Sequence, residues 1–420
     1  MKLSLKNIGK IRNATVELNG ITVIAGENNS GKSTVGKVLY SVFNSFYNIE
    51  HEIRKERISS VENMINILAH DIEILRNIED MEAVATEVVD CSYENDASLE
   101  WLKKKVLAII TQYDDSKNYI DDDKVRMYLE QLCELLLVSN DEILKSILFK
   151  RLTAEFNGQI SNIYTKEHGE IGLQIKDKIM SVFVSNEGVK HVDNQIALRT
   201  ETVYIDDPFV LDELTRIRFT VPNAYLNHRQ HLKNKLNLKE KQINIVEEIV
   251  AINKFEKIYE MISLVCAGDI VRTNRLGWGY QEKNGSEVLN IKNLSTGMKT
   301  FVILKRLLVN GVLEMNGTII LDEPEIHLHP EWQLVFAELI VLLQKEFGMH
   351  ILLNTHSPYF LNAIEVYAAK HEIADKCKYY MTEEVEECSD IVDVTNNIEA
   401  IYAKLARPLQ RLENERYMND

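Results

Sequence analysis

The chain has 420 residues, which at about 150 residues per domain predicts two or three domains. Hydrophobic residues make up 45% and charged residues 27%, as in an ordinary soluble globular protein. Its 48 basic and 64 acidic side chains give a net charge of −16, which disfavours nonspecific coating of nucleic acid. The sequence shows no membrane-spanning apolar run, no signal peptide and no CxxC pair among its five cysteines. These features predict a soluble cytoplasmic protein without membrane contact.

The first 47 residues predict three short strands followed by a helix. Leu3–Ile8 and Ala14–Leu18 alternate between apolar and polar side chains, whereas Ile21–Ala25 is a continuous apolar run. Alternation is typical of a half-buried strand, and a short apolar run is typical of a fully buried one. Asn19-Gly20 predicts a tight turn between the last two strands. Helical spacing of apolar residues then follows over about 32–47.

Between about residues 50 and 160 the pattern is helical with a polar face. Apolar residues recur at helical spacing in 61–75 and in 125–136, and acidic loops at 114–115 and 121–123 separate the helical patches. The heptad repeats of a long coiled coil are not sustained. This segment is therefore predicted to be a compact helical insertion.

The rest of the chain returns to strands and then alternates strands with helices. Strands are expected at 171–175, 180–184, 203–205, 269–273, 278–282, 287–291, 318–321 and 350–354. Helices are expected at about 238–265, 297–309, 331–346, 358–370 and 396–413. Strands that alternate with helices of 10–15 residues predict a mostly parallel sheet.

A glycine-rich segment joins the third strand to the first helix and matches the pattern Gly-x-x-x-x-Gly-Lys-Ser/Thr. Its glycines let backbone N–H groups wrap a phosphate, and the following helix points its positive end at the same place. Lys32 would reach the β- and γ-phosphates, and the Ser33 hydroxyl would hold Mg²⁺. A plain strand-to-helix turn is the alternative. The predicted nucleotide contacts are Gly26, Asn28, Asn29, Ser30, Gly31, Lys32, Ser33 and Thr34.

A second apolar strand, at 318–321, ends in two acidic residues. The carboxyl ends of strands are the places where ligands sit in open α/β sheets. Asp322 would hold Mg²⁺ directly or through water, and Glu323 would orient the attacking water. The alternative is an ordinary strand that stops in solvent, and the phosphate loop upstream argues against it.

Two more segments complete a set of motifs that follow one another in a characteristic order along the chain. The segment 293–299 opens a predicted helix with Ser295 as its N-cap, and His356 follows the strand at 350–354. In the order phosphate loop, capped helix, acidic strand and histidine, the chain resembles ABC-type ATPases. Thr296 and Met298 depart from the usual Leu-Ser-Gly-Gly-Gln signature. These departures lean towards the SMC, RecF and OLD group and away from transporter ATPases.

The resemblance implies an α/β fold, namely an ABC-ATPase head with a mostly parallel P-loop sheet, an antiparallel β subdomain and a helical insertion. The expected domains are 1–48 with the phosphate loop, 49–165 as the insertion, and 166–420 as the remainder of the head. The implied substrate is ATP with Mg²⁺. The implied catalytic residues are Lys32, Glu323 and His356, with His356 touching the γ-phosphate.

The family places each nucleotide between the phosphate loop of one chain and the signature of another, which implies a homodimer or a higher homo-oligomer. Ser295, Gly297 and Lys299 would then complete the site of the partner chain. Gln230 is the candidate for the Mg²⁺-binding glutamine of the family, although a solvated helix start explains its segment equally simply. The segment 325–330 resembles the D-loop of OLD-like ATPases. A metal pair of His327 and His329 is the alternative there, but it lacks further ligands at metal spacing.

OLD relatives carry a nuclease domain after the histidine, but only 64 residues follow His356, and the only Asp-x-Asp is at 121–123. A separate effector protein is therefore expected. In 203–208 and 402–412 the chain resembles the ATPase of the Septu anti-phage systems (PtuA), which works beside a small HNH-type nuclease. We expect a sensor or regulatory ATPase with a nuclease or toxin effector. The alternative is a RecF- or SMC-like repair ATPase that contacts DNA through the basic stretch 216–235.

Overall fold

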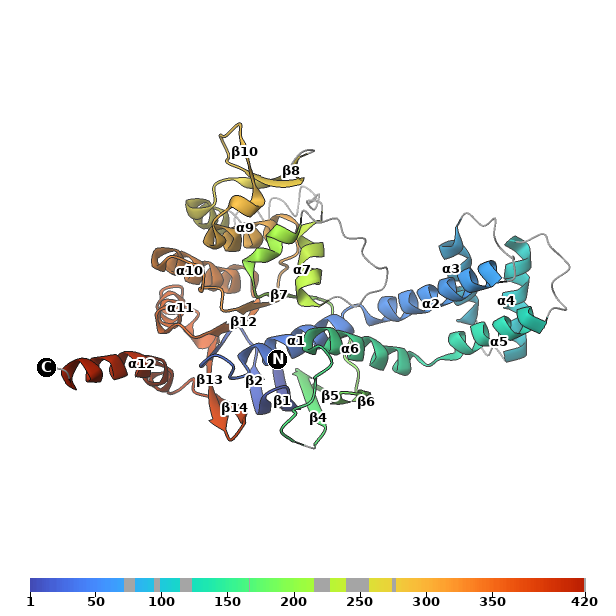
Figure 1. Ribbon diagram of the computed structural model, residues 1–420, viewed down its shortest axis with the longest axis horizontal. Coiled ribbons are helices and arrows are strands. Elements are labelled where there is room, and N and C mark those ends of the chain that lie inside the picture. Colours follow the sequence, from blue (N-terminus) through green and yellow to red (C-terminus); the bar gives the residue numbers. More distant parts are fainter. Residues whose placement is uncertain are drawn as a thin grey trace. The chain divides into compact units, whose positions relative to one another are not determined.

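The computed structural model of the protein describes residues 1–71, 80–93, 99–113, 123–165, 167–214, 227–238, 257–273 and 277–418. These residues form two compact units (Figure 1). The sheet unit consists of residues 1–47 and the described residues from 148 to 418. The helical unit consists of the described residues from 48 to 147. Each unit has its own hydrophobic core.

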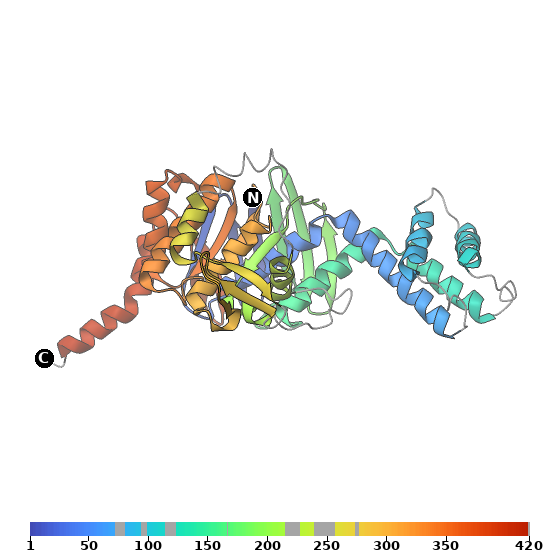
Figure 2. The same cartoon turned by 90° about the horizontal axis from the view of Figure 1, so that it is seen from above.

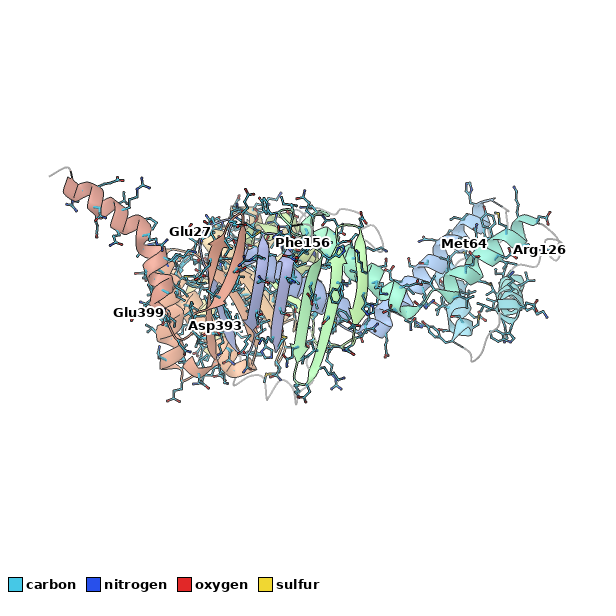
Figure 3. The ribbon with its side chains drawn as sticks, turned by 90° about the horizontal axis from the view of Figure 1, so that it is seen from below. Glu27, Met64, Arg126, Phe156, Asp393 and Glu399 are labelled. Atoms are coloured by element: carbon cyan, nitrogen blue, oxygen red, sulfur yellow. The ribbon has the colours of Figure 1, made fainter. Side chains whose placement is uncertain are left out.

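Within the described residues, the sheet unit contains an eleven-stranded sheet in the order β6-β5-β4-β1-β2-β14-β13-β3-β12-β11-β7. Figure 3 shows part of this order, from the orange strands through the blue strands to the green ones. The strands are β1 (Lys2–Ile8), β2 (Ile11–Glu17), β3 (Ile21–Ala25), β4 (Gly169–Ile175), β5 (Lys178–Ser185), β6 (Gly188–Asp193), β7 (Thr202–Ile205), β11 (Thr318–Asp322), β12 (His350–Thr355), β13 (Cys377–Val385) and β14 (Cys388–Asp393).

The strands β13, β3, β12, β11 and β7 are parallel neighbours. Side chains alternate between the two faces of a strand, so Ile319 and Leu321 of β11 enter the large core while Ile320 points to the other face. There it meets α1 (Lys32–Phe46), in which a Cβ on Gly36 would lie 3.0 Å from Ile320. Helices cover both faces, which explains why these strands read as continuous apolar runs.

The antiparallel strands β6, β5, β4 and β1 continue the same sheet through β2, which pairs in parallel with β14. The predicted α/β fold is confirmed. The sequence pattern does not predict β6, β13 or β14. Four glutamates at 383, 384, 386 and 387 interrupt the apolar pattern that would predict the β13–β14 hairpin. The hairpin is stabilised by pairing of β13 with β3 and of β14 with β2, which a local pattern does not show.

Helices and a small second sheet cover the large one. Seen from above, α9 and the yellow β8–β9 pair lie in front of the strands, and seen from below the strands lie in front (Figures 2 and 3). The remaining elements of the sheet unit are α7 (His228–Leu236), β8 (Asp269–Thr273), β9 (Gly277–Gln281), β10 (Val288–Asn290), α9 (Thr296–Val309), α10 (Pro330–Phe347), α11 (Pro358–Lys370) and α12 (Glu399–Met418), with short 3₁₀ helices at Pro208–Glu213, Ile291–Asn293 and Ala374–Lys376.

The helical unit packs α2 (Ile49–Asp71), α3 (Met81–Ser92), α4 (Leu99–Tyr113) and α5 (Asp123–Leu137) around an apolar core. Arg57 is buried within it and donates hydrogen bonds to the carbonyls of Leu136 and Val138 at the end of α5. A further helix, α6 (Asn140–Phe156), begins in this unit and ends in the sheet unit. The domain boundaries expected from the sequence stay a prediction. The compact helical unit itself ends at Ile147.

Several expected features fall wholly or partly outside the described residues. A single helix is expected at 238–265. The structure describes residues 257–265, which are helical, and residue 238, which is not, while 239–256 lie outside the described residues. The acidic loop at 114–115, most of the one at 121–123, and Arg216 and Arg218 of the basic stretch also lie outside. Among the helices that are described, none is both long enough and apolar enough to cross a membrane.

The core of the helical unit offers a stability test on a single helix. Leu132 of α5 is completely buried, whereas Leu137 of the same helix is 54% exposed. We expect Leu132→Ala to lower the free energy of unfolding by about 2–5 kcal/mol, because it leaves a cavity. Leu137→Ala should change it by less than about 0.5 kcal/mol. Urea denaturation followed by the fluorescence of Trp101, which packs against this core, measures both, and equal losses would contradict the packing.

Candidate functional site

The loop between β3 and α1 has two positions that only glycine fits. Gly31 has φ 88°, and a Cβ there would lie 2.5 Å from the Ile11 side chain. A Cβ on Gly26 would lie 1.9 Å from the hydroxyl of Thr382 on β13. The loop can therefore turn tightly and leave its N–H groups facing outward at the start of a helix, the arrangement that binds phosphate.

Lys32, the first residue of α1, is turned back over this loop. Its side chain is only 4% exposed, and its amine donates to the carbonyls of Gly26, at 3.0 Å, and Glu27, at 2.8 Å. The same amine lies 3.2 Å from a carboxylate oxygen of Glu323. A buried ammonium needs such partners because burial removes its hydration. The loop thus holds one positive charge directly beside an acidic strand end.

Asp322 and Glu323 stand at the carboxyl end of β11. Asp322 accepts hydrogen bonds from the Tyr204 hydroxyl at 2.7 Å and from the side-chain amide of Asn354 at 2.9 Å. Glu323 has φ 51°, an uncommon backbone conformation for a residue other than glycine, and its N–H donates to the Asn354 carbonyl at 2.9 Å. Strained backbone of this kind costs about 1–3 kcal/mol and gathers at functional sites.

His356 follows β12 and lies beside Glu323, with Nδ1 3.3 Å from the same carboxylate oxygen that faces Lys32. Its side chain is 39% exposed, so it can reach a ligand. The turn that carries it is held by Thr355, whose hydroxyl donates to the buried Glu325 and accepts from the N–H of Ser357. Burial raises the pKa of Glu325, although the Thr355 hydroxyl opposes that shift.

These groups surround a cavity of about 400 Å³. Nine of its lining residues are ones that the sequence analysis selects, and Lys10, Asp206 and Ile326 are additional. Asp206 directly follows the buried strand β7, and Asp322 is the last residue of β11, so an acid at the end of an apolar run was the signal that could have identified Asp206. The lining residues are Lys10, Asn28, Asn29, Ser30, Gly31, Lys32, Ser33, Thr34, Asp206, Asp322, Glu323 and Ile326.

The donor set fits a magnesium nucleotide. The Ser33 hydroxyl and the Asp322 carboxylate offer oxygen atoms to one cavity, and Mg²⁺ prefers oxygen ligands shared between protein carboxylates and substrate phosphates. The two glycines leave room where any Cβ would collide. The cavity therefore suits a triphosphate with its metal ion.

Comparison with known proteins agrees with this geometry. Residues 1–361 match the sequence profile of the AAA ATPase domain. The chain belongs to this family of ATPases. The prediction of an ATPase is confirmed at that level. Over 143 residues the chain is also 34% identical to the "Retron Vc95 probable ATPase" of Vibrio cholerae serotype O1 biovar El Tor, a match that covers 31% of this chain and 26% of that relative. The chain thus matches about a quarter of that relative's length.

Solved structures give only distant likenesses. An SMC head bound to the C-terminal winged-helix domain of ScpA aligns with TM-score 0.44 and 12% identity, covering 93% of this chain and 97% of that one. The SMC head domain from Thermotoga maritima aligns with TM-score 0.38 and 14% identity, covering 94% and 98%. The assignment to the AAA ATPase family therefore rests on the sequence match and the cavity.

The signature segment of this ATPase lies away from its own cavity. Ser295 is exposed and caps α9, with its hydroxyl accepting from the N–H of Met298 at 3.3 Å. Gly297 is buried, and a Cβ there would lie 2.9 Å from the carbonyl oxygen of His327. None of the predicted residues Ser295, Gly297 and Lys299 is among the residues that line the phosphate cavity. Their positions allow contact with another molecule or packing within the chain.

Lys299 is buried and paired, and its role as a contact to the nucleotide of a partner chain stays a prediction. Its side chain is 2% exposed and lies 2.7 Å from Asp212. The amine also lies over the Phe209 ring, at 5.1 Å from the centroid. A buried and neutralised amine of this kind cannot turn to a ligand without breaking its ion pair.

The role of Gln230 as a Mg²⁺ ligand also stays a prediction. Its side-chain amide donates to Asn234 on the same helix at 3.4 Å, and Gln230 does not line the cavity described above. Asp206 occupies the strand end beside Asp322 instead. Gln230 lies at the start of a helix, and the local sequence pattern there does not indicate which strand end faces the phosphate loop.

The described part of the predicted basic stretch is neutralised by carboxylates. Arg229 and Lys233 pair with Glu213, and Lys235 pairs with Glu201. His231 also meets Glu201. These pairings remove the free positive charge that contact with DNA phosphates requires, so in the described residues α7 does not form the expected basic face.

The close packing of Gly297 can be tested. We expect Gly297→Ala to destabilise the protein by about 1–3 kcal/mol, because its Cβ would press on the His327 carbonyl and on the Trp332 ring, 3.2 Å away. Gly188→Ala is the matched control, since a Cβ there meets nothing within 4 Å. Thermal unfolding compares the two, and an equal melting temperature for both variants would show that the α9 N-terminus tolerates a side chain.

Proposed function

We propose that the protein binds Mg²⁺–ATP in the cavity at the β3–α1 loop and hydrolyses it. The observation that carries this proposal is the convergence of Lys32, Asp322 and Glu323 around one cavity, with His356 beside Glu323. Lys32 and the loop N–H groups would bind the phosphates, and Ser33 with Asp322 would hold Mg²⁺. When bound, the metal ion offsets phosphate charge in the transition state.

Glu323 is the residue that we assign to orienting the attacking water. In the described structure its carboxylate lies between the Lys32 amine and the His356 ring. A nucleotide that draws Lys32 to its phosphates would release one side of this carboxylate towards the cavity. His356 would then lie beside both the carboxylate and the terminal phosphate. Catalysis here consists of positioning and electrostatic stabilisation, because little covalent chemistry is needed from the protein.

We infer that the active form is a homodimer or a larger homo-oligomer. Ser295 is exposed at the N-terminus of α9 and does not line the cavity of its own chain. A helix N-terminus attracts phosphate. A second chain could place its α9 N-terminus against the nucleotide of the first. The resemblance to ABC-type ATPases implies the same way of completing the site.

The dimer and the role of Glu323 can be tested together. We expect Glu323→Gln to bind ATP but to hydrolyse it at least about 100-fold more slowly, because the water loses its orienting carboxylate, and so to accumulate an ATP-bound dimer. Phosphate release and light scattering measure the two effects. Glu314→Gln, at an exposed position after α9, is the control and should behave as the wild type.

Two additional substitutions sharpen this test. Adding Lys32→Ala should remove both nucleotide binding and the dimer. Adding Ser295→Arg should leave binding to a single chain but prevent the dimer, because the arginine would obstruct the helix end. Wild-type turnover by Glu323→Gln would show that another residue orients the water, and a dimer that survives Ser295→Arg would exclude completion of the site by α9.

We further infer that the protein acts in the cytoplasm as the regulatory ATPase of a bacterial anti-phage system with a separate nuclease or toxin. Support comes from the sequence resemblance to such ATPases and from the relative named as a retron ATPase. The competing role, direct binding to DNA, is disfavoured by the paired charges of α7.

Co-purification with the product of the adjacent gene tests this role. We expect a complex whose mass, determined with and without ATP, shows a second and smaller protein bound to an even number of copies of this chain. A bare oligomer that binds DNA with strong salt dependence would instead support the repair ATPase. A variant that lacks residues 48–147 tests whether the helical unit binds the partner protein.

A further inference from the structure

A buried histidine lies beneath the acidic edge of the cavity. The His228 side chain, at the start of α7, is 10% exposed. Its Nδ1 lies 2.7 Å from Glu155 near the end of α6, and its Nε2 lies 3.0 Å from Asp206 after β7. The Glu155 side chain is 1% exposed and also accepts a hydrogen bond from the His228 backbone N–H. One imidazole therefore joins three elements that are far apart in the sequence.

The geometry indicates a charged imidazolium. A neutral histidine has one N–H and can donate to only one carboxylate, whereas the imidazolium donates from both nitrogens. Here both nitrogens face carboxylates. A positive charge beside Glu155, whose side chain is 1% exposed, offsets the cost of burying that acid.

His228 also supports the second acid of the cavity. Its ring stacks on Tyr204, with the ring centroids 4.3 Å apart and the planes inclined by 23°. The Tyr204 hydroxyl donates to Asp322 at 2.7 Å. Burial raises the pKa of Tyr204 well above its usual value, which keeps this hydroxyl protonated as a donor. His228 thus contacts Asp206 directly and reaches Asp322 through one ring.

The cavity side of Asp206 is open to a ligand. Asp206 lines the cavity together with Ser33 and Asp322. Its side chain is 28% exposed, its Oδ2 faces His228, and its Oδ1 is buried without a hydrogen-bond partner among the residues that the structure describes. Asp206 thus joins the buried Glu155–His228 pair to the edge of the nucleotide site.

We propose that His228 and Glu155 are positioning residues of the nucleotide site, which hold Asp206 and, through Tyr204, Asp322 with their carboxylates directed at the Mg²⁺ of bound ATP. This proposal rests on the proposed function of the cavity. Partners that orient metal-binding side chains change metal affinity by about 10- to 100-fold when they are removed. The effect should therefore appear in how strongly Mg²⁺ improves nucleotide binding.

The test measures binding of a fluorescent non-hydrolysable ATP analogue to the full chain, with Mg²⁺ and with EDTA. The ratio of the two dissociation constants is the magnesium effect. We expect Asp206→Asn and His228→Gln each to reduce this ratio by about tenfold or more. The double variant should reduce it by less than the product of the two single effects, because both substitutions act on the Asp206 carboxylate. His231→Gln, one turn along α7 and paired with Glu201, should stay within about twofold of the wild type.

Glu155→Gln is the second variant and keeps the test decisive if His228→Gln does not fold. It preserves the shape of the side chain and should also reduce the magnesium effect. An unchanged ratio in Glu155→Gln and in any folded His228→Gln would overturn the proposal, and so would additive losses in the double variant. The variant Lys32→Ala distinguishes failure of the proposed function from failure of the positioning role. If that variant binds the analogue normally, the proposed function itself is wrong. If it loses binding while the magnesium effect of the His228 and Glu155 variants is unchanged, only the positioning role is wrong.

Discussion

The site depends on the parallel register of four neighbouring strands. Asp322 on β11 lies opposite Asn354 on β12, Thr355 lies opposite Ala25 on β3, and the end of β7 reaches the same level. Parallel strands end at one edge of a sheet, so this register brings the phosphate loop, both acidic strand ends and the histidine turn together. A shift by one residue would turn Asp322 to the other side of the sheet.

Buried charge is the second constraint, and it is met by pairing. Lys32 faces Glu323, Lys299 faces Asp212, and His228 lies between Glu155 and Asp206. Around the cavity these pairs are arranged so that a ligand can replace one partner. At Lys299 the partner Asp212 does not line that cavity, and the pair neutralises a buried amine. The same residue type thus has different roles because of what surrounds it.

Much of the site could be predicted because it lies on continuous segments. The phosphate loop, Asp322 with Glu323, and His356 each follow a strand whose apolar run is visible in the sequence, and the structure brings all of them to one cavity or its rim. Asp206 was not selected although it follows an apolar run, and Glu155 was not selected because its importance comes from contacts across long sequence separations. Lys299 and Gln230 were selected for their segment, yet their side chains turn to Asp212 and Asn234.

The sequence by itself determined the order of strands and helices, the phosphate loop and the acidic strand end, since these follow from local periodicity and from glycine positions where other residues would clash. Only the tertiary structure decided that β13 and β14 join the large sheet, that the cations of α7 are neutralised, and that His228 links two acids beneath the cavity. The physical reason is that burial and pairing depend on which distant segments pack together, and local sequence pattern carries no record of that choice.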